Sequence, residues 1–240
     1  MNSARLNGRQ ATELRPLKIN LDGLARVDGS ARFGFGDTVA VASVSGPIEV
    51  RLAAENPSSS TFEVQLRPLS NVPTTQSKSL AASIRAALIP SLILSQNPRT
   101  LIQLVIQALS PTRSPSHDTL VASMINASTI ALLNAGSIPM KGVVCAVSIG
   151  RRNSSLIVDP GDEELAALDA SGCFAFAFGN GAEDARCVWT NWKSSVSFNE
   201  KELAECKRLA LIAAQSVWRR IGEVFEGEGS GDEEDEMEVS

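Results

Sequence analysis

The chain has 240 residues, and 43% of its side chains are hydrophobic, so it can bury a substantial core as one large or two small domains. Its net charge of −5 is unevenly distributed, because residues 226–240 contain eight acidic side chains and no basic one. Without that segment the chain carries 22 basic and 19 acidic residues, so the folded part is slightly basic. This composition indicates a globular protein with an acidic C-terminal segment.

The cysteines and the N-terminus argue against two classes of protein. The four cysteines are widely spaced, without the close pairs that a zinc or redox centre needs. The first ten residues lack the apolar stretch of a secretory signal peptide, which together with the unpaired cysteines predicts an intracellular protein. We therefore expect reduced thiols, no metal and no cofactor.

The first quarter of the chain alternates apolar and polar residues, as strands do. A strand is predicted within 25–35, followed by a glycine-aspartate turn and a second strand over 38–46. The Gly46–Pro47 pair is expected to turn the chain into a further strand over 48–55, and residues 61–68 alternate again. These segments predict a twisted antiparallel sheet with one buried face.

A helix, a strand and a second helix are predicted next. Apolar residues at helical spacing indicate a helix over 78–94, which Pro90 is expected to kink. Residues 98–109 predict a strand. No charged residue occurs from Thr119 to Met140, so a helix in this stretch has no solvated face and is expected at the centre of the core.

Local signals mark the two ends of that uncharged helix. Ser114 and Ser116 offer N-cap hydroxyls, Pro115 suits a first turn, and Asp118 places a negative charge near the positive end of the helix dipole. Gly136 is expected to end the helix.

The last third of the chain predicts four strands and a long helix. A Ser197/Glu200 capping box is expected to begin that helix. The polar, acidic residues 226–240 cannot bury enough surface to fold, so we predict one domain over 1–225 and a disordered tail over 226–240. The predicted strands lie at 141–150, 155–159, 174–178 and 187–192.

Several motifs in this order resemble the RNase PH family. Residues 6–16 read LNGRQATELRP, and the glycine-punctuated strands up to Pro47 follow at the spacing typical of that family. Asn97–Thr100 and the helix ending at Gly136 are similar to the eukaryotic exosome branch. The resemblance covers residues 5 to about 222. It implies an α+β RNase PH-like fold, with two βαβα halves of the ribosomal-protein-S5-domain-2-like type and mixed sheets packed on buried helices.

The resemblance also implies a chemistry, phosphorolysis of RNA from the 3′ end, from which this sequence departs. Catalytic members carry Gly-Gly-Thr-Arg-Thr at the start of the central helix, where backbone amides and a guanidinium hold phosphate. The matching stretch here ends in Leu120, Val121 and Ala122. A second phosphate-binding arginine aligns with Ala86, or with Ala82 if the register shifts by one turn.

The family's catalytic carboxylates are incomplete as well. Active members carry Asp-Leu-Asp and a further Asp, where this chain has Ile157 at the first position, Asp159 at the second and Asp162 or Glu163 near the last. Asp159, Asp162, Glu163 and Glu164 are compatible with a divalent metal site, but a solvated turn is the favoured interpretation. His117, the only histidine, is expected on the surface.

The resemblance therefore predicts a non-catalytic subunit of the six-membered ring of the eukaryotic RNA exosome. Expected partners are other RNase PH-like subunits, cap subunits with RNA-binding domains, and single-stranded RNA in the central channel, with no membrane. Arg67 and Lys78 are predicted to lie on the RNA path. The expected location is the nucleus and nucleolus, and also the cytoplasm. The alternatives are an active phosphate-dependent 3′ to 5′ exoribonuclease and a free-standing homo-oligomeric RNA-binding protein.

Overall fold

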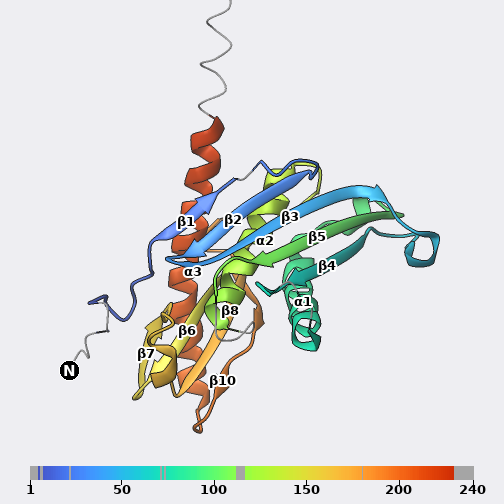
Figure 1. The fold of residues 1–240 in the computed structure, drawn as a ribbon. Helices are drawn as coiled ribbons and strands as arrows, with labels where there is room; N and C mark the ends of the chain where they lie inside the picture. Colours follow the sequence, from blue (N-terminus) through green and yellow to red (C-terminus); the bar gives the residue numbers. More distant parts are fainter. Residues whose placement is uncertain are drawn as a thin grey trace, which may run out of the picture.

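The computed structural model describes residues 5, 8–21, 23–70, 72, 74–111, 117–179 and 181–229. Two β-sheets enclose helix α2 (Asp118–Ala135), and helix α3 (Glu200–Gly229) packs on the second sheet (Figure 1). Helix α1 (Thr75–Leu88) lies beside one edge of the first sheet. This arrangement confirms the predicted α+β fold built around a buried central helix.

The first sheet has five strands in the order β1-β2-β3-β5-β4. They are β1 (Leu17–Asn20), β2 (Gly29–Phe35), β3 (Thr38–Glu49), β4 (Thr61–Arg67) and β5 (Thr100–Ala108). β2 and β3 form the predicted hairpin. β4 pairs with β5 in parallel, because the crossover through α1 returns the chain in the same direction. The prediction of a purely antiparallel sheet was therefore wrong for β4.

The Gly46–Pro47 pair, which is joined by a cis peptide bond, bends β3 without ending it. The register between β3 and β5 shifts between Ser45 and Ile48, and pairing then continues to the end of β3. Gly46 has φ +154°, and a Cβ there would lie 2.9 Å from the carbonyl oxygen of Leu101. The pair is a bulge inside one strand, so the predicted turn into a new strand was wrong.

Helix α1 is shorter than predicted. Thr74 caps it by accepting a hydrogen bond from the backbone N–H of Ser77 at 3.2 Å. The helix ends at Leu88, and Pro90 lies in the separate 3-10 turn Ile89–Ser91. Because proline removes a backbone donor and clashes with the preceding turn, it ends the helix here, and the predicted kinked continuation was wrong.

The second sheet is antiparallel throughout, in the order β10-β8-β6-β7, with β9 also paired to β8. Its strands are β6 (Val143–Arg152), β7 (Ser155–Val158), β8 (Ala170–Phe178), β9 (Ala185–Thr190) and β10 (Lys193–Ser194). In the described residues between these strands, the only helical segment is the 3-10 turn Leu165–Ala167. The two halves of the fold therefore differ, because the second has no α-helix corresponding to α1.

Helix α2 is buried from Asp118 to Leu132, as its uncharged sequence predicts. The side-chain amide of Asn126 hydrogen-bonds both backbone groups of Ala146 in β6, as a neighbouring strand would. It donates to the carbonyl at 2.9 Å and accepts from the N–H at 2.7 Å. Gly136 ends the helix in the left-handed conformation, as predicted. The three residues expected to cap its start, 114–116, lie outside the described residues. None of the described helices is long and apolar enough to cross a membrane.

The N-cap of helix α3 lies two residues after the predicted one. The side chain of Asn199 accepts a hydrogen bond from the N–H of Glu202 at 2.9 Å, so Asn199 caps the helix and the predicted Ser197/Glu200 box was wrong. One face of the helix packs on the core, with Cys206, Ala210, Ala213, Val217 and Ile221 all buried. The helix reaches Gly229, past the boundary expected at 225, and residues 230–240 lie outside the description.

The closest backbone approach in the core occurs where β2 crosses α2. A Cβ on Gly29 would lie 2.4 Å from the carbonyl oxygen of Ala131 and 2.5 Å from the nitrogen of Ala135, both in the helix backbone. Helix and sheet are therefore in contact through a position that only glycine fits.

Replacing Gly29 with alanine is expected to lower the free energy of unfolding by about 1–3 kcal/mol or more, because backbone atoms must move to admit the methyl group. Urea unfolding measures the change. The matched control is Gly23→Ala, since nothing lies within 4 Å of a Cβ at that position. Equal stability of the two variants would show that the two elements are not packed this closely.

Candidate functional site

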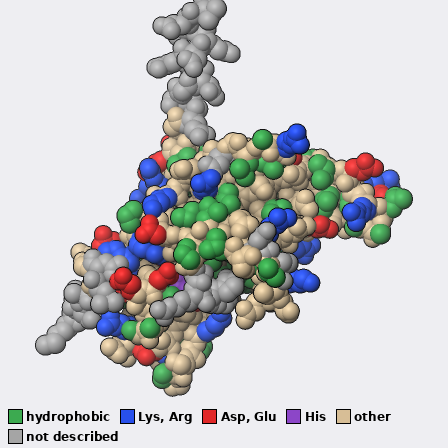
Figure 2. Space-filling model, viewed as in Figure 1, with side chains coloured by type: hydrophobic (Ala, Val, Ile, Leu, Met, Phe, Trp, Pro, Cys, Tyr) green, Lys and Arg blue, Asp and Glu red, His purple; other side chains and the backbone are tan. Residues whose placement is uncertain are grey.

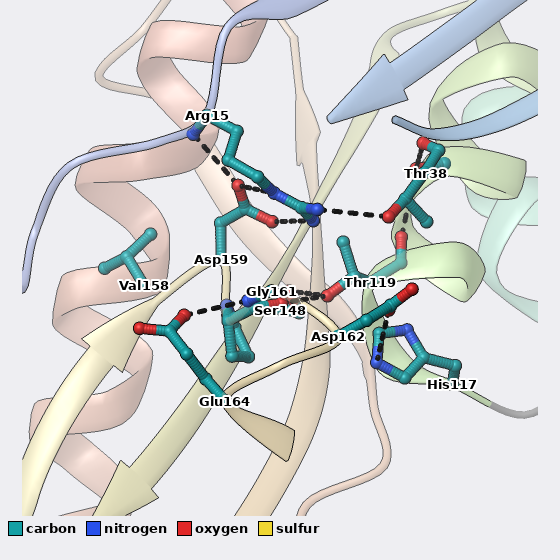
Figure 3. Close-up of polar contacts among 12 residues, drawn as sticks. Arg15, Thr38, His117, Thr119, Ser148, Val158, Asp159, Gly161, Asp162 and Glu164 are labelled. Atoms are coloured by element: carbon teal, nitrogen blue, oxygen red, sulfur yellow. Dashed lines mark hydrogen bonds and ion pairs between the residues drawn. The ribbon is translucent and has the colours of Figure 1, made fainter. Parts of the chain in front are cut away.

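The carboxylates singled out in the sequence follow β7, where the chain passes between the start of α2 and the N-terminal segment (Figure 3). Asp159 comes directly after the strand, with φ +49°, and its N–H donates to the carbonyl of Ser148 at 2.9 Å. Glu164 follows one short loop later. Both residues are buried, Asp159 being 0% and Glu164 1% exposed.

Asp159 is held by Arg15 of the N-terminal segment. The guanidinium donates to both carboxylate oxygens, from Nη2 at 2.7 Å and from Nε at 2.9 Å, and the backbone N–H of Arg15 adds a third bond at 2.9 Å (Figure 3). The remaining Nη1 of Arg15 donates to the hydroxyl of Thr38 at 3.1 Å. This carboxylate therefore connects the second half of the fold to the N-terminal segment and to β3.

Glu164 is held in the same way by Arg5. Arg5 donates from Nε at 2.9 Å and from Nη2 at 2.7 Å, and the N–H of Gly161 donates to the same carboxylate at 2.9 Å. Burial opposes ionisation of Glu164, but the hydrogen bond from Arg5 outweighs it and lowers the pKa of Glu164 below its ordinary value of 4.5. Arg5 also donates to the carbonyls of Val158 and Asp159, at 2.8 Å and 2.9 Å.

A third arginine lies between these two pairs. Arg9 has Nη1 3.6 Å from Asp159 and Nη2 3.7 Å from Glu164, and its side chain is 12% exposed. Burial, followed by repulsion from Arg5, lowers the pKa of Arg9. We call Arg5, Arg9, Arg15, Asp159 and Glu164 the arginine–carboxylate cluster. Three guanidinium groups on two carboxylates leave no bare carboxylate oxygen inside it.

The predicted solvated turn was therefore wrong for Asp159 and Glu164, whereas Asp162 and Glu163 are exposed. Local sequence does not indicate this burial, because the partner arginines lie about 150 residues earlier in the chain. Among the described residues, no group of three or more His, Cys, Asp or Glu side chains is placed to hold a metal ion. The four acids do not converge on one point.

The start of α2 faces this cluster. His117, in the N-cap position, was expected on the surface but is only 9% exposed, so that expectation was wrong. Among the described residues, neither ring nitrogen has a hydrogen-bond partner, and Nε2 lies 3.8 Å from Oδ1 of Asp162 (Figure 3). Burial lowers the pKa of His117 below 6.5, outweighing the opposing effect of the nearby aspartates.

Two neighbours of His117 are fully hydrogen-bonded. Asp118 accepts from the hydroxyl of Ser171 at 2.5 Å and from the amide of Asn191 at 2.9 Å. The Thr119 hydroxyl is 2.9 Å from that of Ser148. The first turn of α2 is thus attached to the second sheet.

The positions aligned with the family's phosphate-binding residues have no anion-binding side chain. Leu120, Val121 and Ala122 are 0% exposed and belong to the core. Ala86 lies on the exposed face of α1, and Ile157 is a buried residue of β7. That these positions once matched the family's phosphate-binding and catalytic residues stays a prediction. In the structure, the buried ones pack like ordinary core residues.

Arg67 and Lys78, the predicted RNA contacts, lie together. They line a groove of about 690 Å³ between β4 and α1, along with Arg85 and the apolar residues Phe62 and Leu66. Both are exposed. The structure brings these two bases to one groove, and their contact with RNA stays a prediction.

Sequence reasoning missed the three arginines of the cluster. Arg9 and Arg15 lie in the GR and ELRP motifs, which indicated a family without indicating what the side chains contact. Arg5 precedes both motifs. Buried cations need carboxylate partners. The basic N-terminal segment and the acidic loop after Val158 were therefore the available signal that these two segments pair.

Comparison with known proteins identifies the family. A model described as the 3′ exoribonuclease family, domain 1, or RNase PH, matches residues 13–137. A curated relative, the exosome complex component RRP46 of Saccharomyces cerevisiae, is 31% identical over 85% of this chain and 92% of its own length. The chain belongs to the RNase PH family. The exosome complex component Rrp41 of Archaeoglobus fulgidus is 27% identical over 95% of this chain and 94% of its own.

Solved structures of RNase PH proteins agree. The crystal structure of rice Rrp46 superimposes with a TM-score of 0.77 at 25% identity, over 90% of this chain and 98% of that one. The Archaeoglobus fulgidus exosome with RNA bound to the active site gives 0.76 at 19% identity, over 91% and 92%. At that identity the second match shows the fold alone. The RNase PH fold predicted from the motifs is confirmed.

The Arg5–Glu164 pair can be tested with a double-mutant cycle. Arg5→Met or Glu164→Met alone is expected to lower the free energy of unfolding by about 3–5 kcal/mol, because each leaves a buried charge without its two-bonded partner. The double variant should lose much less than the sum. Urea unfolding of all four proteins gives the coupling, and the exposed Arg208–Glu205 pair is the control expected to show none. Additive losses at Arg5 and Glu164 would contradict the assignment.

His117 predicts an acid sensitivity of stability. As the pH falls through 6.5, the unfolded chain takes up a proton that the folded chain, with its lower pKa, does not, so the free energy of unfolding decreases. Between pH 7 and pH 5.5 the unmodified protein should therefore lose more stability than His117→Gln, with pH 8 as the common reference. An equal loss in both proteins would show that the histidine is accessible and its pKa ordinary.

Proposed function

We propose that this protein is a non-catalytic structural subunit of the six-membered ring of a eukaryotic RNA exosome. The observation that carries the proposal is the arginine–carboxylate cluster: the carboxylate aligned with a catalytic position, Asp159, accepts three hydrogen bonds from Arg15. A carboxylate engaged in this way is not free to hold a metal or to donate a proton to a leaving group.

The surrounding positions support the same conclusion. Phosphorolysis requires groups that stabilise the attacking phosphate, and the aligned positions hold Val121 and Ala86. Each such electrostatic group commonly contributes a factor of about 10² or more to the rate. Loss of two of them, and of a carboxylate at Ile157, would remove most of the rate enhancement. The family's fold remains while its chemistry is missing.

The names of the relatives support membership in a ring. RRP46 of Saccharomyces cerevisiae and its Schizosaccharomyces pombe counterpart are both named as exosome complex components, and this chain spans most of each. We infer that this chain occupies the equivalent place, between other RNase PH-like subunits and beneath cap subunits with RNA-binding domains. RNA processing there, including maturation of ribosomal RNA, would place it in the nucleus and nucleolus, and also in the cytoplasm.

The surface offers a suitable subunit contact. No helix lies over the outer face of the first sheet in Figure 1, and apolar side chains gather on the face seen in Figure 2. Val39, Val41 and Val105, on the less buried face of two central strands of the first sheet, are only half-buried. A half-exposed apolar sheet face of this kind is typical of a surface that another protein covers.

In the proposed channel, Arg67 and Lys78 contact the phosphates of single-stranded RNA. Phosphate contacts need only positive charge in a groove, carry no base specificity and weaken with salt. The two bases meet that requirement at the groove between β4 and α1. This part of the proposal predicts electrostatic guidance of RNA without cleavage.

Purified protein given RNA, phosphate and Mg²⁺ is expected to release no nucleoside diphosphate above background, both alone and assembled with ring partners. Chromatography of labelled RNA measures the products, native mass spectrometry measures assembly, and an archaeal exosome serves as the active control. Phosphate-dependent shortening that falls on Asp162→Asn, a change at an exposed residue, would establish the active enzyme instead. If the protein forms a homo-oligomer and does not bind ring partners, it is the free-standing RNA-binding protein instead.

A further inference from the structure

The groove between β4 and α1 follows a strand edge that no other described strand covers. β4 is the last strand of the first sheet, where it pairs only with β5. The carbonyl oxygen of Phe62 accepts a hydrogen bond from Nε of Arg85 at 2.7 Å, so the backbone groups of Phe62 face this edge. Because alternate residues of a strand direct their backbone groups to the same side, those of Val64 and Leu66 face the edge as well.

These edge groups are available to an added strand. Among the described residues, the backbone groups of Val64 and Leu66 have no hydrogen-bond partner outside the sheet. An unpaired edge of this kind can accept an extended segment of another protein through main-chain hydrogen bonds.

The groove has the size of a short extended peptide. Its volume is about 690 Å³, and the part of β4 that lines it, from Phe62 to Arg67, is about 17 Å long. On the side of α1 it is lined by the small residues Ala81 and Ala82, which leave room beside the strand. Val64 is half-buried and offers an apolar surface inside the groove.

Basic side chains lie at both ends of the groove. Arg67 is the last residue of β4 and Lys78 lies in the first turn of α1, so these two share one end. Arg85 is hydrogen-bonded to Phe62 near the start of the strand, which places it at the other end.

The charge of these basic residues is not balanced within the groove. Among the described residues that line it, Glu63 is the only acid. In the described part of the chain, none of Arg67, Lys78 and Arg85 forms an ion pair. A ligand with negative charge at both ends therefore complements the groove.

The lining favours a peptide over RNA as the ligand of the whole groove. RNA phosphates need only the basic side chains, and single strands are held further by stacking on accessible aromatic rings. The one aromatic ring among the described lining residues is Phe62, which is 1% exposed. An extended acidic peptide uses the strand edge, the apolar surface and the basic ends together.

We propose that this groove binds an extended acidic segment of a partner protein, which adds to β4 as a further strand of the first sheet. Apolar side chains of the segment pack on Val64 and Ala82, and acidic side chains at its two ends pair with Lys78 and Arg85. The site goes beyond the proposed function, because RNA contact does not require the strand edge or Arg85. At Lys78 the segment and RNA exclude each other.

The probe is an end-capped synthetic peptide, Glu-Asp-Val-Thr-Val-Thr-Val-Asp-Glu, added to the full chain. Fluorescence anisotropy is expected to show saturable binding, and NMR should show slower amide hydrogen exchange at Val64 and Leu66, because a strand now covers their N–H groups. A peptide with Lys in place of the acids, and one with N-methylated valines, should each bind several-fold more weakly. Absence of binding, or equal binding of the N-methylated peptide, would overturn strand addition.

Two variants test the place of binding. Ala82→Trp fills the groove from an exposed helix position, and Lys78→Glu/Arg85→Glu reverses the charge at its ends. Both are expected to weaken peptide binding several-fold, while circular dichroism shows that each variant is folded. The matched controls are Ser79→Trp, on α1 outside the groove lining, and Arg186→Glu/Lys207→Glu, in the groove between β9 and α3. Equal losses in variants and controls would overturn the proposed site.

Hexauridylate separates the peptide from RNA. If hexauridylate binds and Ala82→Trp abolishes its binding, while the acidic peptide does not bind, the groove is an RNA site and the proposal is overturned. If the peptide binds as described and Lys78→Glu has no effect on hexauridylate, the peptide site is established and the proposed RNA contact at Lys78 is contradicted.

Discussion

The arginine–carboxylate cluster is the interaction on which the rest of the structure depends. Arg5 and Arg15 connect the N-terminal segment to Glu164 and Asp159 of the second half, and Arg15 reaches Thr38 of the first sheet as well. Charges buried this deeply are stable only as pairs with their remaining hydrogen bonds made. Because the cluster satisfies that condition, it fixes the N-terminal segment and the loop after β7 in one arrangement. In this chain the two carboxylates of that loop make structural contacts.

Helix α2 is the element around which both sheets pack. It is buried between two sheets, anchored by Asn126 on one side and by close approach to Gly29 on the other. Apolar residues such as Leu120 and Val121 at its start add to the core that surrounds it. Apolar side chains suit these positions because the positions are buried. Under the proposed function, the fold persists without phosphorolytic activity.

Much of the fold follows from the sequence because its signals are local. The alternation in β2 and β3, and the uncharged stretch of α2, identify elements whose burial the structure confirms. The errors arise where distant residues decide. The parallel pairing of β4 depends on β5, and the burial of Asp159 depends on Arg15, 144 residues earlier. His117 has no local signal for burial either, since Asp162, the carboxylate that its ring faces, lies 45 residues later in the chain.

Under the proposed function, Asp159 and Glu164 have structural roles and bind no catalytic metal ion. The most direct measurement is ¹³C NMR of the carboxyl signals while Mn²⁺ and phosphate are added to the purified protein. The account predicts that exposed carboxyls such as Glu163 broaden in proportion to the added metal, while the Asp159 and Glu164 signals stay sharp. Selective broadening of Asp159 at low Mn²⁺, strengthened by phosphate, would show a working metal and phosphate site and contradict the account.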